Sequence, residues 1–203
     1  MPEPSTTSSE PPDGPRRPGA ESPERLRAEP PERLRAEPVA ERFRGRPSFA
    51  FMKPRLSRWI AFGFGSGLSP VAPGTVGTLW AWAAFAALDP WLWDAAWWAV
   101  IVASFAIGCW ACERTGRDLG VSDHGGMVWD EVVAFWAVLL IVPPGFTSQL
   151  AAFFVFRIFD VLKPPPIRQV DRGVKGGFGV MLDDAIAAFY TVLVFALWRA
   201  IFQ

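Results

Sequence analysis

The chain has 203 residues, which is enough for one domain with a hydrophobic core. Its 20 basic and 20 acidic residues cancel, and no basic arm with interleaved aromatic residues occurs, so we expect no nucleic-acid partner. Nothing in the sequence indicates a protein partner either. Hydrophobic residues make up 51% of the chain, a high share for a soluble domain. Composition therefore favours a protein that is associated with a membrane.

Residues 1–51 differ from the rest of the chain. They hold 11 of the 20 prolines and few large apolar side chains, so they have too little apolar surface to offset the entropy of ordering. Residues 23–30 and 31–38 repeat the octapeptide PERLRAEP. The segment has no apolar stretch of the kind found in a secretory signal. We predict a disordered tail over 1–51 and a helical domain over 52–203.

The helical domain is predicted from five apolar runs. They lie at residues 76–88, 91–112, 127–142, 147–162 and 180–202. Only 91–112 and 180–202 reach the ~20 residues that a membrane-spanning helix needs. No run alternates with a period of two, so strands are not expected. We predict an all-α, multi-helical bundle that is membrane-associated and has short or broken hydrophobic helices. Basic residues in several loops leave its topology open.

A Gly-, Ser- and Pro-rich segment precedes the first of these runs, from Gly63 to Thr78. Small residues let backbone N–H groups approach an anion, and the start of the following helix favours negative charge. Ser66 and Thr75 are therefore candidates for binding a phosphate. The segment lacks the Gly-Lys-Ser/Thr of a P-loop. A loop that only turns the chain is an equal alternative for this segment taken alone.

Asp130 and Glu131 stand directly before the apolar residues 132–142. Ionised carboxylates in such a place need a cation, and Mg²⁺ binds a few carboxylates together with water and phosphate. The alternative is a pair of acids favoured by the dipole at a helix N-terminus. Asp123 and His124 precede them as further candidates, although Gly125 and Gly126 argue against one continuous helix.

Arg157 and Asp160 are spaced for an ion pair within one helix, which Pro164 must end. This pair can be purely structural. Lys163 and Arg168 flank the stiff Pro-Pro-Pro segment, an arrangement suited to presenting cations to a phosphate.

The last apolar run begins with Asp183 and Asp184, after a loop that carries Arg172 and Lys175. A purely structural membrane helix has little reason to begin in this way. Four acid-bearing segments with glycines and cations beside them are more specific than any one alone. Together they predict a site that holds a metal ion over a phosphate.

The four segments resemble the motifs of bacterial phosphatidylglycerophosphatase A. In chain order they read GFGSGLSPVAPGTVGT, DHGGMVWDE, FRIFDVLKPPPI and DRGVKGGFGVMLDD, and the resemblance covers about residues 56–203. It implies an α-helical, magnesium-dependent enzyme of the bacterial inner membrane. That enzyme removes the terminal phosphate of phosphatidylglycerophosphate to give phosphatidylglycerol. The resemblance carries over five acidic positions, which are Asp130, Glu131, Asp160, Asp183 and Asp184.

Other phosphatase chemistries lack their residues in this chain. No Cys is followed by an Arg with five residues between them, no Asp-x-Asp occurs, and His124 is the single histidine. The remaining route is attack on phosphorus by a water that a metal ion activates.

We therefore assign roles to the candidates as a hypothesis. One or two Mg²⁺ are held by four acids, Asp130, Glu131, Asp183 and Asp184. Asp160 is a further ligand or the base. The phosphate oxygens are neutralised by a basic set, Lys163, Arg168, Arg172 and Lys175.

Two other functions are compatible with acids among apolar helices. A small transporter or channel would use them to carry ions, but it would show two related halves, and no second copy of any motif is found. A helical scaffold would only pair them with Arg and Lys. For the favoured enzyme, the expected location is the bacterial inner membrane, with the active site facing the cytoplasm.

Overall fold

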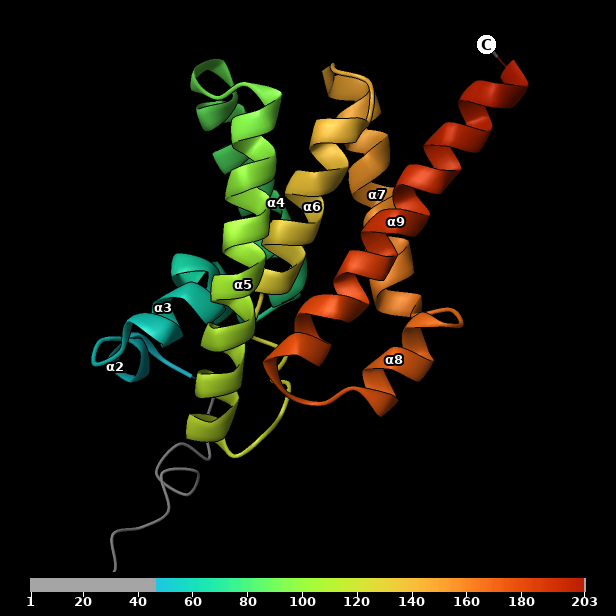
Figure 1. Ribbon diagram of the computed structural model, residues 1–203. Coiled ribbons are helices and arrows are strands. Elements are labelled where there is room, and N and C mark those ends of the chain that lie inside the picture. Colours follow the sequence, from blue (N-terminus) through green and yellow to red (C-terminus); the bar gives the residue numbers. More distant parts are fainter. Residues whose placement is uncertain (1–46, 203) are drawn as a thin grey trace, which may run out of the picture. The chain divides into compact units, whose positions relative to one another are not determined.

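The structure is a computed structural model that describes residues 47–202, and it is all-α over this range (Figure 1). The tail predicted to be disordered, residues 1–51, lies largely outside the described residues. The octapeptide repeat lies wholly outside them. The helices, in chain order, are α2 (Phe49–Met52), α3 (Leu56–Ala61), the 3-10 segment η3 (Gly63–Leu68), α4 (Pro73–Leu88), the 3-10 turn η4 (Asp89–Trp91), α5 (Asp94–Leu119), α6 (Trp129–Ile141), α7 (Phe146–Leu162), α8 (Ile167–Gly173) and α9 (Gly176–Phe202). No strand occurs among the described residues, as predicted.

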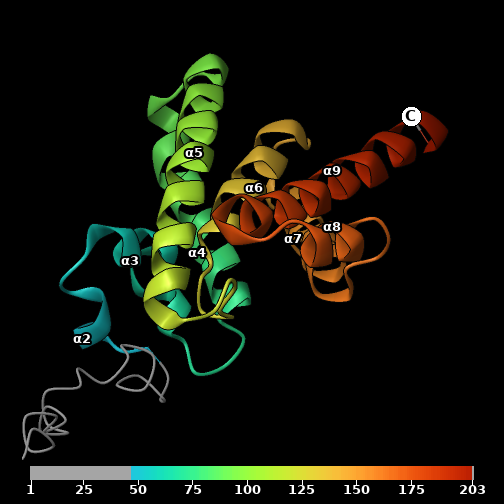
Figure 2. The ribbon, with the colours of Figure 1, turned by 60° about the horizontal axis from the view of Figure 1, so that its bottom comes forward.

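Helix α6 is the centre of the bundle. It is apolar on all sides, and ten of its 13 residues are buried, as expected for a helix surrounded by others. Helices α4, α5, α7 and α9 all contact it (Figure 2). The indole N–H groups of Trp129 and Trp136 donate to the backbone oxygens of Ser104 on α5 and Ala81 on α4, which satisfies these buried donors.

Local signals in the sequence explain where the helices begin and end. Pro73 is the first residue of α4, where its missing N–H costs nothing. Helix α5 ends at Gly120, whose φ of 73° lies in the left-handed region that glycine adopts freely. Helix α7 ends before Pro164, as predicted. Helix α6 starts only at Trp129, so Asp123 and Asp130 do not share a helix.

The folded part begins before the domain boundary predicted at residue 52. Phe51 and Met52, at the end of α2, have no exposed surface. The guanidinium of Arg58 on α3 lies 4.0 Å from the ring centroid of Phe51, and its Nη1 donates to the Phe51 backbone oxygen at 2.7 Å. Arg58 and Arg55 also pair with Asp118 near the end of α5, which ties α3 to α5.

Two helices, α5 and α9, are long and apolar enough to cross a membrane. Only 28% of the apolar window of α5 and 17% of that of α9 is buried, so most residues of both windows keep some exposed surface. Helices α4, α6 and α7 have 16, 13 and 17 residues, about 24, 20 and 26 Å at 1.5 Å per residue, which is less than a membrane's apolar thickness. This pattern supports the predicted membrane association with short helices.

The segment η3 packs tightly against the turn that leads into α6. A Cβ on Gly67 would lie 2.0 Å from the backbone oxygen of Gly126, and the Val128 N–H donates to the Ala61 backbone oxygen at 2.8 Å. These contacts fix the entry of α6, and therefore the position of the acids in its first turn.

Replacing Gly67 by alanine should destabilise the protein, because a backbone oxygen cannot move aside for the new methyl group. We expect a loss of about 1–3 kcal/mol, read as a lower melting temperature in detergent. Gly125→Ala is the control, since a Cβ there meets nothing within 4 Å. Equal melting temperatures for the two variants would contradict the packing described.

Candidate active site

Three buried acids from two helices converge at one end of the bundle. Asp130 and Glu131 lie in the first turn of α6, and Asp184 lies about two turns into α9. Each offers a carboxylate oxygen, and these oxygens all lie within 4.8 Å of one another. The side chains are 8%, 9% and 2% exposed, and Asp130 Oδ1, Glu131 Oε2 and Asp184 Oδ2 have no hydrogen-bond partner. We call these three residues the acid trio.

Burial makes the charges of the trio costly. It raises the pKa of Asp130 well above its usual range, with the neighbouring Glu131 adding to the effect, and it raises the pKa of Glu131 to about 7. A divalent cation among the three carboxylates would reverse this by favouring their ionised forms. Mg²⁺ prefers hard oxygen ligands. Each acid of the trio has one buried carboxylate oxygen without a hydrogen-bond partner, so the trio fits such an ion.

Arg157 of α7 places one positive charge beside the trio. It pairs with Asp160 one turn further along α7, as the spacing predicted, and its Nη1 lies 3.5 Å from Glu131 Oε1. Its Nη1 also donates to Thr78 Oγ1 at 3.4 Å. One guanidinium cannot balance Asp160 and the three acids of the trio when all four are ionised.

The start of α4 lies against the same ion pair. A Cβ on Gly74 would be 2.2 Å from Glu131 Oε1 and 2.9 Å from Arg157 Nη2, so a larger residue here would displace the ends of these two side chains. The first N–H groups of a helix have no acceptor within it, and they favour an anion. Thr75 follows Gly74 in this turn and is half-buried. Ser66 lies in η3, where its hydroxyl donates to the Gly63 backbone oxygen at 2.8 Å.

Lys163 forms a second charged group with two other acids. Its Nζ donates to Asp171 Oδ1 at 3.0 Å and to Asp183 Oδ2. Although burial acts to lower the pKa of Lys163, the bonds to Asp183 and Asp171 outweigh it and raise the pKa. Asp183 therefore belongs to this second charged group and is not one of the three acids of the trio, and its role as a metal ligand stays a prediction. Its Oδ1 is buried without a partner.

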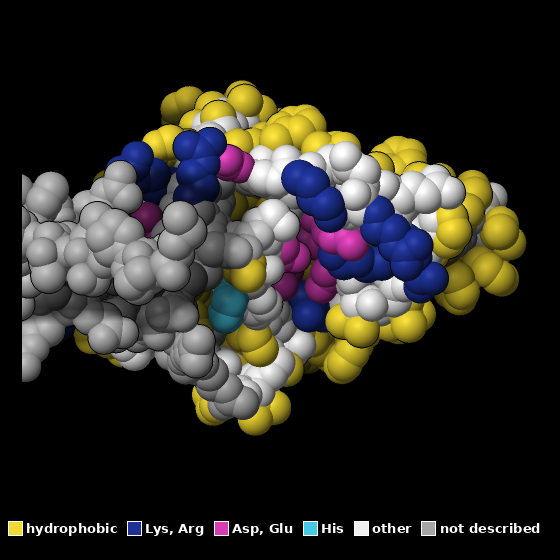
Figure 3. Space-filling view, turned by 90° about the horizontal axis from the view of Figure 1, so that it is seen from below, with side chains coloured by type: hydrophobic (Ala, Val, Ile, Leu, Met, Phe, Trp, Pro, Cys, Tyr) yellow, Lys and Arg dark blue, Asp and Glu magenta, His cyan; other side chains and the backbone are white. Residues whose placement is uncertain are grey.

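The remaining predicted cations lie on the surface around the acids. Arg168, Arg172 and Lys175 are exposed on α8 and on the turn after it. Arg168 Nη2 donates to the Leu162 backbone oxygen at 3.3 Å and Lys175 Nζ to the Asp171 backbone oxygen at 3.0 Å. Figure 3 shows acidic side chains gathered in a hollow of this face, with Lys and Arg on either side of them.

Asp123 and His124 lie at the edge of the site. Asp123 is exposed and lines a small pocket together with Asp171 and Lys175. The Nδ1 of His124 accepts the Gly126 N–H at 3.0 Å, so this histidine holds the turn before α6. Its ring lies 6.1 Å from that of Phe62. The geometry gives His124 a structural task in the loop.

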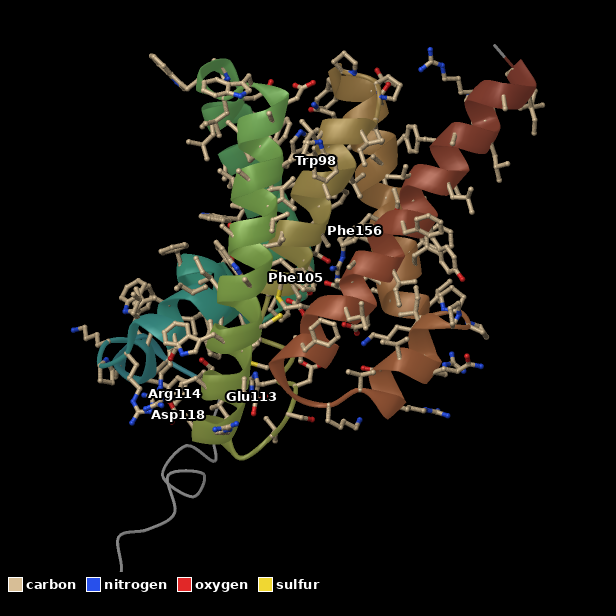
Figure 4. All side chains as sticks on the ribbon, in the orientation of Figure 1. Trp98, Phe105, Glu113, Arg114, Asp118 and Phe156 are labelled. Carbon is tan, nitrogen blue, oxygen red and sulfur yellow. The ribbon has the colours of Figure 1, made fainter. Side chains whose placement is uncertain are left out.

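Glu113 of α5 is a positioning residue that the sequence did not reveal. Its Oε2 accepts the Gly177 N–H at 2.8 Å and so satisfies a donor at the start of α9 (Figure 4). A Cβ on Gly177 would lie 1.9 Å from the Cys109 backbone oxygen, so this glycine lets α9 approach α5 closely. In the sequence, Glu113 reads as an ordinary partner of Arg117 four residues later, a pair that is also present.

Glu113→Ala should lower the melting temperature, because the Gly177 N–H loses its acceptor. Loss of a helix cap costs about 0.5–2 kcal/mol. Glu113→Gln keeps an acceptor oxygen and should restore most of this stability. Arg117→Ala is the control, since it removes only the exposed ion pair, which contributes at most about 1 kcal/mol. If Glu113→Ala and Arg117→Ala were equally stable, the capping role would be wrong.

Comparison with known proteins identifies the family. The family model described as phosphatidylglycerophosphatase A matches residues 59–199. The chain is 45% identical over 132 residues to phosphatidylglycerophosphatase A of Escherichia coli (strain K12). This alignment covers 63% of this chain and 74% of that protein. It is 44% identical over 136 residues to phosphatidylglycerophosphatase A of Haemophilus influenzae, covering 66% of this chain and 83% of that protein.

A third relative comes from Bacteroides thetaiotaomicron. It is 40% identical over 163 residues, 76% of this chain and 96% of that protein, and its name assigns it provisionally as a phosphatidylinositol-3-phosphatase. No solved structure matches the chain. The family model spans well over half of the chain, and all four acid-bearing segments lie within it. The chain is therefore a phosphatase of the phosphatidylglycerophosphatase A family.

Proposed function

We propose that this enzyme removes the terminal phosphate of phosphatidylglycerophosphate, with Mg²⁺ as its cofactor, and yields phosphatidylglycerol. The names of the relatives from E. coli and H. influenzae support the substrate. The observation that carries the cofactor is the acid trio, in which each acid has one buried oxygen without a hydrogen-bond partner. Membership of a phosphatase family leaves no support for the transporter, channel or scaffold alternatives.

The trio is the proposed place of the metal ion. Asp130, Glu131 and Asp184 would each supply an oxygen, with water and a phosphate oxygen completing the coordination. Bound there, Mg²⁺ supplies a double positive charge that polarises the phosphate and activates a water molecule. The low exposure of the three side chains keeps competing bulk water away from this charge.

The phosphate is proposed to lie between the trio and the cations around it. Arg157 and Gly74 of the first turn of α4 adjoin Glu131 directly, and Thr75 follows Gly74 in that turn. Lys163 pairs with Asp183, and basic side chains lie on either side of the acidic hollow in Figure 3. Planar guanidinium groups and free backbone N–H groups suit the oxygens of a phosphate. Ser66 stays a predicted contact, because its hydroxyl donates within its own turn.

The reaction is proposed as a direct displacement. A water oxygen forms a bond to phosphorus while the bond from phosphorus to the glycerol oxygen breaks. Asp160 is our candidate for accepting the proton of the water, since Arg157 holds its carboxylate beside the trio. The leaving glycerol oxygen takes up a proton, so that the products are the lipid alcohol and inorganic phosphate. Arg157 and Lys163 stabilise the charge on the phosphate oxygens during this exchange.

The bacterial inner membrane is the proposed location, with the site facing the cytoplasm. Arg114 lies at the same end of α5 as Glu113 and Asp118, while Trp98 lies toward the opposite end (Figure 4). Asp118 pairs there with Arg55 and Arg58 of the segment around α3. Arg55, Arg58 and Arg114, whose side of the membrane the sequence left open, therefore gather at one end of α5. Such clusters normally face the cytoplasm.

Phosphate release from phosphatidylglycerophosphate by the purified chain tests the proposed function. We expect release with Mg²⁺, loss of release with EDTA, and recovery when Mg²⁺ is returned, because the trio would again hold its ion. Phosphatidylinositol 3-phosphate is the comparison substrate, chosen for the name of the third relative. Faster hydrolysis of that lipid, or activity that EDTA leaves unchanged, would contradict the proposal.

Glu131→Gln and Asp184→Asn should each reduce turnover by at least about 100-fold, because each removes one charged ligand of the proposed ion. The measurement is phosphate release at saturating Mg²⁺. Asp94→Asn, a change of an exposed acid at the first residue of α5, is the matched control and should keep full turnover. Full turnover in either trio variant would show that the trio does not hold the catalytic ion.

A further inference from the structure

Asp183 and Asp184 are neighbours in the sequence, but they serve two different groups of residues. Successive side chains on a helix leave it about 100° apart, so two neighbouring carboxylates can reach different partners. Asp184 faces Asp130 and Glu131 of α6, within the trio. Asp183 faces Lys163, which donates to its Oδ2.

Lys163 is held from three helices. It follows the last residue of α7 with a φ of 43°, in the left-handed region that side-chain-bearing residues seldom adopt. Its Nζ bonds to Asp171 on α8 and to Asp183 on α9. The two ion pairs hold the ammonium group beside Asp183, the neighbour of Asp184 of the trio. A lysine that served only as a mobile surface charge would not need such support.

We infer that this site takes one divalent cation, at the acid trio, and that the ammonium group of Lys163 supplies the second fixed positive charge. This inference rests on the proposed function. It makes Asp183 the partner that positions Lys163, and not a metal ligand. Phosphatases with two metal ions hold the attacking and leaving oxygens between the ions, about 3.5–4 Å apart. Here a lysine would replace the second of those ions.

The arrangement of the other acids favours one ion. Among residues 47–202, the trio is the one group of three or more potential ligands whose donor atoms come together. Asp171 and Asp183 meet around the ammonium group of Lys163, and that group already balances part of their charge. Asp123 is exposed and borders the pocket beside Asp171, so it does not complete a second buried trio.

The test is the number of Mn²⁺ ions that the full chain binds in detergent without substrate, measured from the electron paramagnetic resonance signal of free Mn²⁺. We expect one tight site per chain. Asp184→Asn should weaken this site by at least about 100-fold, because a direct ligand loses its charge. Asp183→Asn should change it by no more than about fivefold, because only a nearby charge is lost. These two variants make the same chemical change at adjacent positions.

Turnover provides the second readout. Asp183→Asn and Lys163→Gln should keep the Mn²⁺ site but release phosphate at least about 10-fold more slowly, and Lys163→Arg should recover part of that loss because it keeps the charge. Two tight Mn²⁺ sites per chain would overturn the inference. So would a loss of Mn²⁺ affinity in Asp183→Asn as large as in Asp184→Asn. Binding is measured without substrate, so a failed inference is distinguishable from a chain that does not hydrolyse the lipid.

Discussion

The structure depends on the burial of three like charges between α6 and α9. Asp130, Glu131 and Asp184 bring their oxygens within 4.8 Å of one another, in a place where burial opposes ionisation. Such an arrangement is unfavourable unless a cation or protons compensate it. The rest of the site can be understood as the means by which the fold holds these carboxylates in place.

The supporting contacts come from close approaches of the backbone. Gly67 fixes the turn before α6, Gly177 lets α9 lie against α5, and Gly74 brings the first turn of α4 against Glu131. Glu113 then caps α9 from the neighbouring helix. Because Gly67 and Gly177 meet backbone oxygens and Gly74 meets the end of the Glu131 side chain, the glycine-rich motifs have a packing role as well as the phosphate-binding role expected for them. The same glycines thus connect the fold to the chemistry.

Much of the fold could be predicted because its signals are local. The apolar runs gave α4, α5, α6, α7 and α9, and Pro164 marked the end of α7. The acids of the site stood out because carboxylates next to apolar runs are costly. The sequence could not reveal contacts between residues that lie far apart in the chain. Glu113 accepts a hydrogen bond from Gly177, 64 residues later, and Lys163 pairs with Asp183 and not with its neighbour Asp184. Burial of Phe51 was missed because it follows a segment of disorder-prone composition.

The central claim is that the trio holds the catalytic cation, and anomalous X-ray scattering from crystals grown with Mn²⁺ tests it most directly. The account predicts one strong anomalous peak between α6 and α9, within coordination distance of Asp130, Glu131 and Asp184. A peak beside Asp171 and Asp183 with none at the trio would contradict it, because the ion would then lie where the account places the ammonium group of Lys163.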